Sequence, residues 1–251
     1  MQTNNEKNKS RIGDERPKNS KGEVIIACDF PNKEKTLEFL DQFKKVKPFV
    51  KIGMELFYAE GPDIVRDIRA RGHKIFLDLK LHDIPNTVGS AMKVLSGLDI
   101  DMVNVHAAGG IEMMKAARDG LTGKDGSAPL LIAVTQLTSI AQKQMNEELG
   151  IAGSLEDAVA AYASNAKKAG LDGVVCSPLE SSMIHERVGS DFLTVTPGIR
   201  FASGDKQDQK RVTTPDGARQ LGSDFIVVGR SITKADDPAA AYDRAMFEFC
   251  R

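Results

Sequence analysis

The sequence has few cysteines, no long apolar run and almost no net charge. Each of these absences excludes certain classes of protein. The three cysteines, Cys28, Cys176 and Cys250, are widely spaced without a CxxC pair, so neither a disulfide framework nor a zinc cluster is indicated. No apolar run approaches the roughly 18 residues of a membrane helix, and no signal-peptide stretch opens the chain. We therefore expect a cytoplasmic protein.

The net charge of −1 gives no global field that would attract nucleic acid or a membrane surface. With 41% hydrophobic and 27% charged residues among 251, the composition is typical of a soluble globular protein. We expect no nucleic-acid or membrane partner, and ligands must be inferred from local sites.

Two regions differ in character along the chain. Residues 1–22 are polar and nearly devoid of large apolar side chains, so burial cannot offset their ordering entropy and a disordered tail is predicted. Interspersed acids, such as Asp14 and Glu15, argue against a basic arm that binds nucleic acid. Residues 23–251 are predicted to form a single catalytic domain.

Within that domain, short β-branched runs alternate with segments of helical period. Each run is apolar on both faces, as parallel strands covered by helices are. The eight runs are EVIIACD, FVKIG, KIFLDLK, DMVNVHA, PLLIAVT, GVVCS, FLTVTPG and DFIVVG. This alternation favours an α/β fold of the (β/α)₈ TIM barrel type. A doubly wound open sheet is the alternative, because periodicity does not show whether a sheet closes.

Charged and polar residues, a proline and a glycine occur where the predicted strands end. In barrel enzymes the active site is built at the carboxyl ends of the strands. The residues at or just past these ends are Asp29, Lys51, Lys80, His106, Thr135, Pro197 and Gly229. Their placement favours the barrel and predicts an active site at this face.

The stretch FLDLKLHDIPNTV places three charges in and just after the third strand. Asp78 and Lys80 are two residues apart and share one face, whereas Asp83 lies beyond the strand. Flanking carboxylates keep a lysine protonated, which favours proton donation over attack on a carbonyl. Asp29 and Lys51 on neighbouring strands would extend this into an alternating array of acids and bases. A structural ion-pair network is the alternative.

A second cluster follows the last two strands. Gly229 and Arg230 come directly after the eighth strand, and loops after strands seven and eight recurrently bind phosphate in barrels. The loop 201–211, which contains Gln209, is interpreted either as a lid or as a solvated surface loop. His82 and His106 lack the spacing of a metal triad, so no metal site is expected. These residues together predict an enzyme for a small phosphorylated substrate.

Seven blocks of the sequence also match a known pattern. They are ACD, KIGMELF, DLKLHDIPNTV, VNVHAAGG, VTQLTS, TVTPGIR and VVGRSITKA, in order from about residue 24 to residue 242. Together they closely resemble the orotidine 5'-phosphate decarboxylase family, in its bacterial, monofunctional form. The resemblance implies conversion of orotidine 5'-monophosphate to uridine 5'-monophosphate and CO₂, the last step of de novo pyrimidine synthesis. It implies neither metal nor organic cofactor.

The resemblance also implies a role for each matching residue. Lys80 would protonate C6, and Asp78 would face the departing carboxylate. Asp29 and Lys51 would hold the ribose hydroxyls and link to the charged array. Asp83 and Thr87 would be supplied by the partner subunit of a homodimer. Thr138 would read the pyrimidine amide edge, and Pro197 would contact the substrate. The 5'-phosphate would be held by Arg200, Gln209, Gly229 and Arg230.

Three other functions remain open from the residues alone. A sugar-phosphate enzyme on the same barrel shares the Asp-x-Lys-x-x-Asp strand and uses magnesium, but Lys51 would repel the metal. A Schiff-base aldolase that uses Lys80 is disfavoured because flanking acids keep the amine protonated. A non-catalytic scaffold would gain stability by replacing its buried charges with apolar groups.

Overall fold

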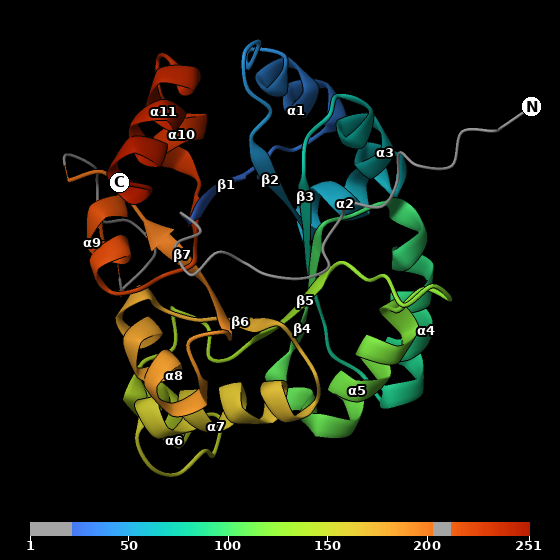
Figure 1. Ribbon diagram of the computed structural model, residues 1–251, viewed down its shortest axis with the longest axis vertical. Helices are drawn as coiled ribbons and strands as arrows, with labels where there is room; N and C mark the ends of the chain where they lie inside the picture. Colours follow the sequence, from blue (N-terminus) through green and yellow to red (C-terminus); the bar gives the residue numbers. More distant parts are fainter. Residues whose placement is uncertain (1–21, 203–211) are drawn as a thin grey trace, which may run out of the picture.

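The strands close into one parallel barrel in the computed structural model, which describes residues 22–202 and 212–251 (Figure 1). The strands are β1 (Glu23–Ala27), β2 (Phe49–Gly53), β3 (Ile75–Leu81), β4 (Met102–His106), β5 (Leu130–Val134), β6 (Gly173–Val175), β7 (Leu193–Ile199) and β8 (Phe225–Val228). β1 pairs with β2 on one side and with β8 on the other, where Val24 lies opposite Ile226. The predicted (β/α)₈ TIM barrel is confirmed, and the open-sheet alternative is wrong.

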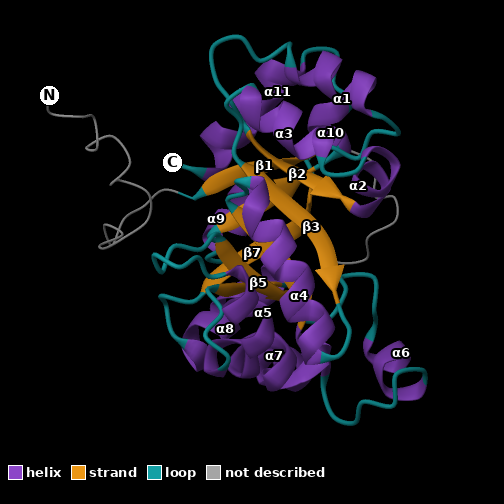
Figure 2. Cartoon of the chain, turned by 90° about the vertical axis from the view of Figure 1, so that its right-hand side faces the viewer, coloured by secondary structure: helices purple, strands orange, loops and turns teal. Residues whose placement is uncertain are grey.

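Helices surround the barrel (Figures 1 and 2). They are α1 (Lys33–Leu40), α2 (Met54–Glu60), α3 (Asp63–Ala70), α4 (Pro85–Leu95), α5 (Gly110–Leu121), α6 (Gln142–Glu147), α7 (Leu155–Lys168), α8 (Ser181–Val188), α9 (Pro215–Gln220), α10 (Arg230–Thr233) and α11 (Pro238–Phe249). α11 packs on β1, so the two ends of the domain meet. α6 projects away from the strands in the segment after β5 (Figure 2). Within the described chain, no helix combines the length and the apolar character needed to cross a membrane.

The helix boundaries follow local signals in the sequence. Ser154 is the N-cap of α7, and its hydroxyl oxygen accepts the backbone N–H of Asp157. The carboxylate of Asp157 accepts the hydroxyl of Ser154 in return. Gly170 follows the last turn with a φ of +81°, a left-handed conformation that glycine adopts without steric cost.

Alternating side chains along the strands create an outer and an inner core. Outward residues pack against the helices in one large cluster. The inner cluster that fills the barrel consists of Ile25, Ala27, Phe49, Phe76, Met102, Ile132, Val195 and Val227. Towards the carboxyl ends the inner positions become charged: Phe49 is followed by Lys51, and Phe76 by Asp78 and Lys80. The barrel therefore has an apolar floor below a charged mouth.

Three similar ion pairs lie at the opposite, amino-terminal end of the barrel. In each, an aspartate just before an even-numbered strand accepts the backbone N–H at the start of the preceding strand, at 2.7–2.8 Å. Each aspartate also pairs with a cationic side chain of a surrounding helix. The sets are Asp101 with Ile75 and Arg69, Asp172 with Leu131 and Arg118, and Asp224 with Thr194 and His185. We call these three sets the amino-end clamps.

Candidate active site

A cavity of about 450 Å³ lies at the carboxyl ends of the strands, the position of the active site in barrel enzymes. Its floor is apolar, with Phe76, Val134, Val175 and Val227 among the lining residues. Its charged and hydroxyl- or amide-bearing lining residues are Asp29, Lys51, Asp78, Lys80, Gln136, Thr138, Ser139, Arg200, Arg230 and Ser231. The cavity thus combines an apolar base with polar groups that converge from several strands, as small-molecule sites do.

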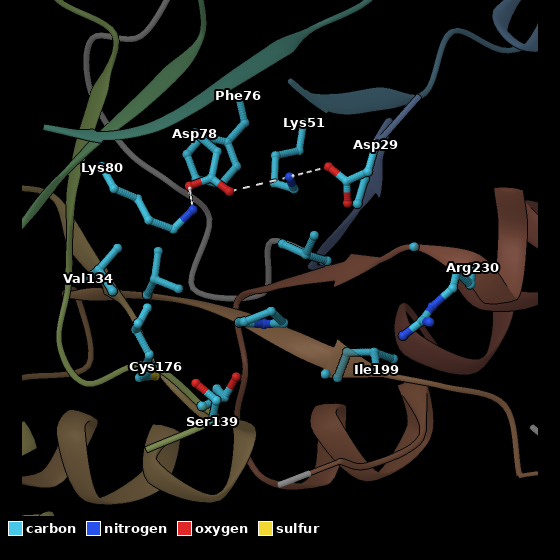
Figure 3. Close-up of a pocket in the computed structure, with 18 of the residues that line it drawn as sticks. Asp29, Lys51, Phe76, Asp78, Lys80, Val134, Ser139, Cys176, Ile199 and Arg230 are labelled. Atoms are coloured by element: carbon cyan, nitrogen blue, oxygen red, sulfur yellow. Dashed lines mark hydrogen bonds and ion pairs between the residues drawn. The ribbon is translucent and has the colours of Figure 1, made fainter. Parts of the chain in front are cut away.

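Four charged side chains form a row along one wall (Figure 3). The Nζ atom of Lys51 lies 3.0 Å from Oδ1 of Asp29 and 3.3 Å from Oδ2 of Asp78. The other oxygen of Asp78 accepts a 2.7 Å hydrogen bond from Nζ of Lys80. Three neighbouring strand ends therefore bring acid, base, acid and base together in that order, as the sequence predicts.

The two central members of this row stabilise each other's charge. Lys51 is 9% exposed and Asp78 is 8% exposed. Burial opposes the charge of Lys51, but Asp78 and Asp29 outweigh it and raise the pKa of the lysine. Burial also opposes the charge of Asp78, but Lys51 and Lys80 outweigh it and lower the pKa of the carboxyl. Lys51 and Asp78 therefore each favour the charged form of the other.

Lys80 reaches the cavity from an irregular part of β3. Four residue steps along β3, from Leu77 to Leu81, match only two steps along β4, from Val103 to Val105. Within this irregularity Lys80 has a φ of +53°, a left-handed conformation that costs a non-glycine residue roughly 1–2 kcal/mol. Strain of this kind persists where surrounding contacts enforce it, and it is frequent at active sites.

The opposite end of the cavity carries two arginines and two glycines. Arg200 and Gly198 come from the end of β7, and Gly229 and Arg230 follow β8. Figure 3 shows Arg230 across the cavity from the charged row. A Cβ atom on Gly229 would meet only that of Ala27, at 3.7 Å, so the glycine leaves space in the cavity. This end combines glycine backbone with two guanidinium groups, and guanidinium groups bind phosphate through paired hydrogen bonds.

Several residues singled out from the sequence do not line the cavity of this chain. Asp83 and Thr87 are exposed beyond β3, and a carboxylate oxygen of Asp83 accepts the N–H of Ile84. His106 and Thr135 stand at strand ends but are not among the lining residues. Gln209 lies outside the described residues, as do residues 1–21 of the predicted tail.

Sequence reasoning missed three polar lining residues and one buried amide. Gln136 and Ser139 lie in the segment after β5, and Ser231 follows β8. All three come just past strand ends, the position that selected Thr135 and Gly229 from the sequence. Asn104, on β4, is fully buried and contacts both Asp78 and Lys80. No local sequence signal marks it, because its importance depends on which strand lies beside β3.

No group of three or more His, Cys, Asp or Glu side chains in the described ranges is arranged to hold a metal ion. At the carboxylates of the row, the Lys51 ammonium occupies the space between Asp29 and Asp78. A divalent cation placed there would be repelled by that charge.

The sequence matches a family of known enzymes and several of its named members. Residues 22–245 match the model of the orotidine 5'-phosphate decarboxylase / HUMPS family. Proteins named orotidine 5'-phosphate decarboxylase from Bacillus mycoides and Bacillus cytotoxicus are each 60% identical over 222 residues, which is 87% of this chain and 93% of the relative.

Solved structures give the same result. The crystal structure of orotidine 5'-phosphate decarboxylase from Lactobacillus acidophilus has a TM-score of 0.82 at 45% identity and covers 92% of this chain and 100% of its own. An uncharacterized conserved protein from Geobacillus kaustophilus has a TM-score of 0.81 at 50% identity, covering 90% of this chain and 99% of its own. This chain therefore belongs to the orotidine 5'-phosphate decarboxylase / HUMPS family.

Proposed function

We propose that this chain decarboxylates orotidine 5'-monophosphate to uridine 5'-monophosphate and CO₂. The observation that carries the proposal is the continuous row from Asp29 to Lys80, set in a cavity whose far end carries Arg200 and Arg230. The 60% identity to relatives of that name over most of the chain supports the same substrate. The reaction is a carboxy-lyase step in pyrimidine biosynthesis.

The cavity suggests one orientation for the substrate. The 5'-phosphate would lie against Arg200, Gly229 and Arg230, of which the two arginines offer guanidinium groups. The ribose hydroxyls would face Asp29 and Lys51. The pyrimidine edge would then reach the segment after β5, where Thr138, with Gln136 and Ser139 beside it, offers hydrogen-bonding groups. Pro197 would contact the substrate from β7.

In this orientation C6 of the base lies at the other end of the row, beside Asp78 and Lys80. The bond between C6 and the carboxylate carbon breaks, CO₂ leaves, and the electron pair stays on C6. That orbital lies in the plane of the ring, so the π system cannot delocalise it and the site must stabilise the charge. Lys80 carries the nearest proton and transfers it to C6, which completes the replacement of CO₂ by hydrogen.

Asp78 would act on the substrate before the bond breaks. Its carboxylate would face that of the substrate, and repulsion between the two raises the energy of the bound ground state. Its bonds to Lys51 and Lys80 keep it charged and fixed for this role. Binding energy from the distant phosphate offsets the repulsion.

The proposal includes a homodimer with shared sites. Asp83 and Thr87 do not line the cavity of their own chain and are exposed. This exposure leaves them available to enter the site of a partner subunit, with Asp83 approaching Lys80 and Thr87 approaching the ribose. Gln209 would contact the phosphate in the same complete site. A cytoplasmic location is also part of the proposal.

Two other enzyme functions give different experimental results. A magnesium-dependent sugar-phosphate enzyme would lose its activity in chelator and regain it with Mg²⁺. A Schiff-base aldolase would trap its substrate on Lys80 when borohydride is added. A non-catalytic scaffold would turn over none of these substrates.

The deciding experiment follows the ultraviolet change of orotidine monophosphate with purified protein in excess chelator, beside the Lys80→Ala variant. Rapid turnover by the wild type and its loss in the variant are expected. An inactive wild type would refute the proposed substrate and direct the search to phosphorylated sugars with magnesium. An active Lys80→Ala variant would refute the role of Lys80 while keeping the reaction.

A further inference from the structure

We propose that Asn104 is a positioning residue for decarboxylation, fixing Asp78 and Lys80 relative to each other through its side-chain amide. The inference rests on the proposed function and assigns a role to a residue outside the cavity wall. Asn104 lies on β4 with its side chain fully buried, and it is not among the lining residues. It therefore acts on the substrate only through its neighbours.

The two halves of the amide bind the two neighbours separately. Nδ2 of Asn104 donates a 2.6 Å hydrogen bond to Oδ1 of Asp78. Oδ1 of Asn104 accepts the backbone N–H of Lys80 at 2.8 Å. Turning the amide over would place its NH₂ group against an N–H donor and its oxygen against a carboxylate. The neighbours therefore determine the orientation of the amide, and the amide connects them.

The bond to Lys80 occupies a gap in the sheet. Between Leu77 and Leu81 the register of β3 and β4 shifts, and the side chain of Asn104 binds the Lys80 N–H within this gap. Leaving this partly buried N–H unpaired would be costly, so the bond supports the backbone conformation in which Lys80 has its φ of +53°. The conformation in turn determines where Nζ enters the cavity.

The bond to Asp78 determines the rotation of the carboxylate. Oδ1 of Asp78 receives two donors, Nδ2 of Asn104 and Nζ of Lys80, at 2.6 and 2.7 Å. Oδ2 faces Lys51 at 3.3 Å. With Nδ2 removed, Oδ1 would be held by the lysine alone, and carboxylate and ammonium could move together away from C6. Errors of about 1 Å in such groups can cost roughly 100-fold in rate.

A buried amide is a costly choice if its role is only to fill space. An apolar side chain of similar volume would pack inside the barrel without desolvating polar atoms. The amide of Asn104 instead bonds one member of the Asp78–Lys80 pair through its nitrogen and the other through its oxygen. This arrangement is suited to controlling the geometry of the pair.

The test compares kcat and KM for orotidine monophosphate, across pH, in the wild type, Asn104→Ala and Asn104→Asp, together with thermal unfolding. In Asn104→Ala, kcat should fall about 100-fold because Asp78 and Lys80 are misplaced. KM should stay within a few-fold of the wild-type value, because Asn104 does not line the cavity. A purely structural residue would lower Tm and leave this kcat unchanged.

The Asn104→Asp variant gives a signature in the pH profile. It is isosteric and keeps an oxygen for the Lys80 N–H, so it should fold even if the alanine variant does not. Its second oxygen would lie against the carboxylate of Asp78, and the two would repel each other. A buried carboxyl beside another carboxylate has a raised pKa. Its kcat should therefore be low at about pH 8 and rise as the pH falls and the new carboxyl gains a proton that it can donate. The kcat of the wild type should show no such rise.

The matched control is Thr196→Val. Thr196 is equally buried, and its hydroxyl bonds Ser223 and the carbonyl oxygen of Phe225, away from the cavity lining. This control should lower Tm with kcat unchanged. If a folded Asn104→Ala keeps kcat within about twofold of the wild type, or Asn104→Asp follows the wild-type pH profile, the positioning role is wrong. An inactive wild type would instead refute the proposed function and, with it, the role given to Asn104.

Discussion

The two ends of this barrel use ion pairs differently. At the amino end, each clamp aspartate binds a strand N–H and a cation from a surrounding helix. At the carboxyl end, Asp78 is bound by Lys51 and Lys80, both on strands and both lining the cavity. One arrangement ties backbone elements together, whereas the other presents charge to a ligand.

The difference shows what each pairing contributes. A carboxylate bonded to a backbone N–H stabilises one strand register, and its cation compensates the charge. In the charged row, the ionic groups pair with one another and also face the cavity. Their pairing therefore contributes more to catalysis than to the stability of the fold. We therefore expect substitutions at the carboxyl end to affect activity and those at the amino end to affect stability.

The largest effect is expected for Lys80→Ala. Loss of the proton donor should reduce kcat by about 10⁴-fold. Tm should change by only a few degrees, because Asp78 keeps Lys51 and Asn104 as partners. Initial rates and thermal melts measure the two quantities. A large loss of stability with modest loss of activity would place this ion pair in the same class as the clamps.

The next largest effect is a recovery of activity on mixing. Lys80→Ala and Asp83→Ala subunits should each be nearly inactive, but a mixed dimer contains one site with both residues intact. Random exchange would restore about a quarter of all sites. Activity is measured after the subunits exchange, beside each variant treated alone. A mixture as inactive as its parents would contradict the shared site.

At the amino end, Arg118→Ala should lower stability and leave kcat unchanged. It removes the cation beside Asp172 and leaves the partly buried pair incomplete, at a cost of about 1–3 kcal/mol. The matched control is Lys115→Ala on the same helix, whose pair with Glu112 is exposed and contributes less than about 1 kcal/mol. Denaturant unfolding measures the free energy of unfolding of both variants. Equal losses would show that the clamp stabilises the fold no more than an exposed ion pair does.

The smallest effect is a pH dependence in the third clamp. The hydrogen bond to Asp224 outweighs burial and raises the pKa of His185 above its ordinary value of 6.5. The clamp's ionic stabilisation is therefore complete below pH 6.5 and is lost as the pH rises through the folded-state pKa. His185→Gln should cost more stability at low pH than at high pH, by up to about 1 kcal/mol. Urea unfolding at both pH values measures this, and a pH-independent cost would refute it.

Much of the fold was predictable from local patterns in the sequence. The eight strands are apolar on both faces because the barrel interior buries one face and the helices bury the other. Caps such as Ser154 and Gly170 mark helix ends by local hydrogen bonding and backbone conformation. Strand-end position also selected Asp29, Lys51 and Lys80 as site residues, because parallel strands bring their carboxyl ends to one face.

The strands, the caps and the charged residues at one face can thus be read from the sequence, since these features depend on neighbours along the chain. The pairing of β1 with β8, the left-handed backbone of Lys80 and the hydrogen bond from Asn104 to Asp78 become visible only in the folded barrel. These features depend on register and contact between segments far apart in sequence, and such contacts have no local signal. The charges of the site were visible in the sequence, but the support that orients them exists only in the folded barrel.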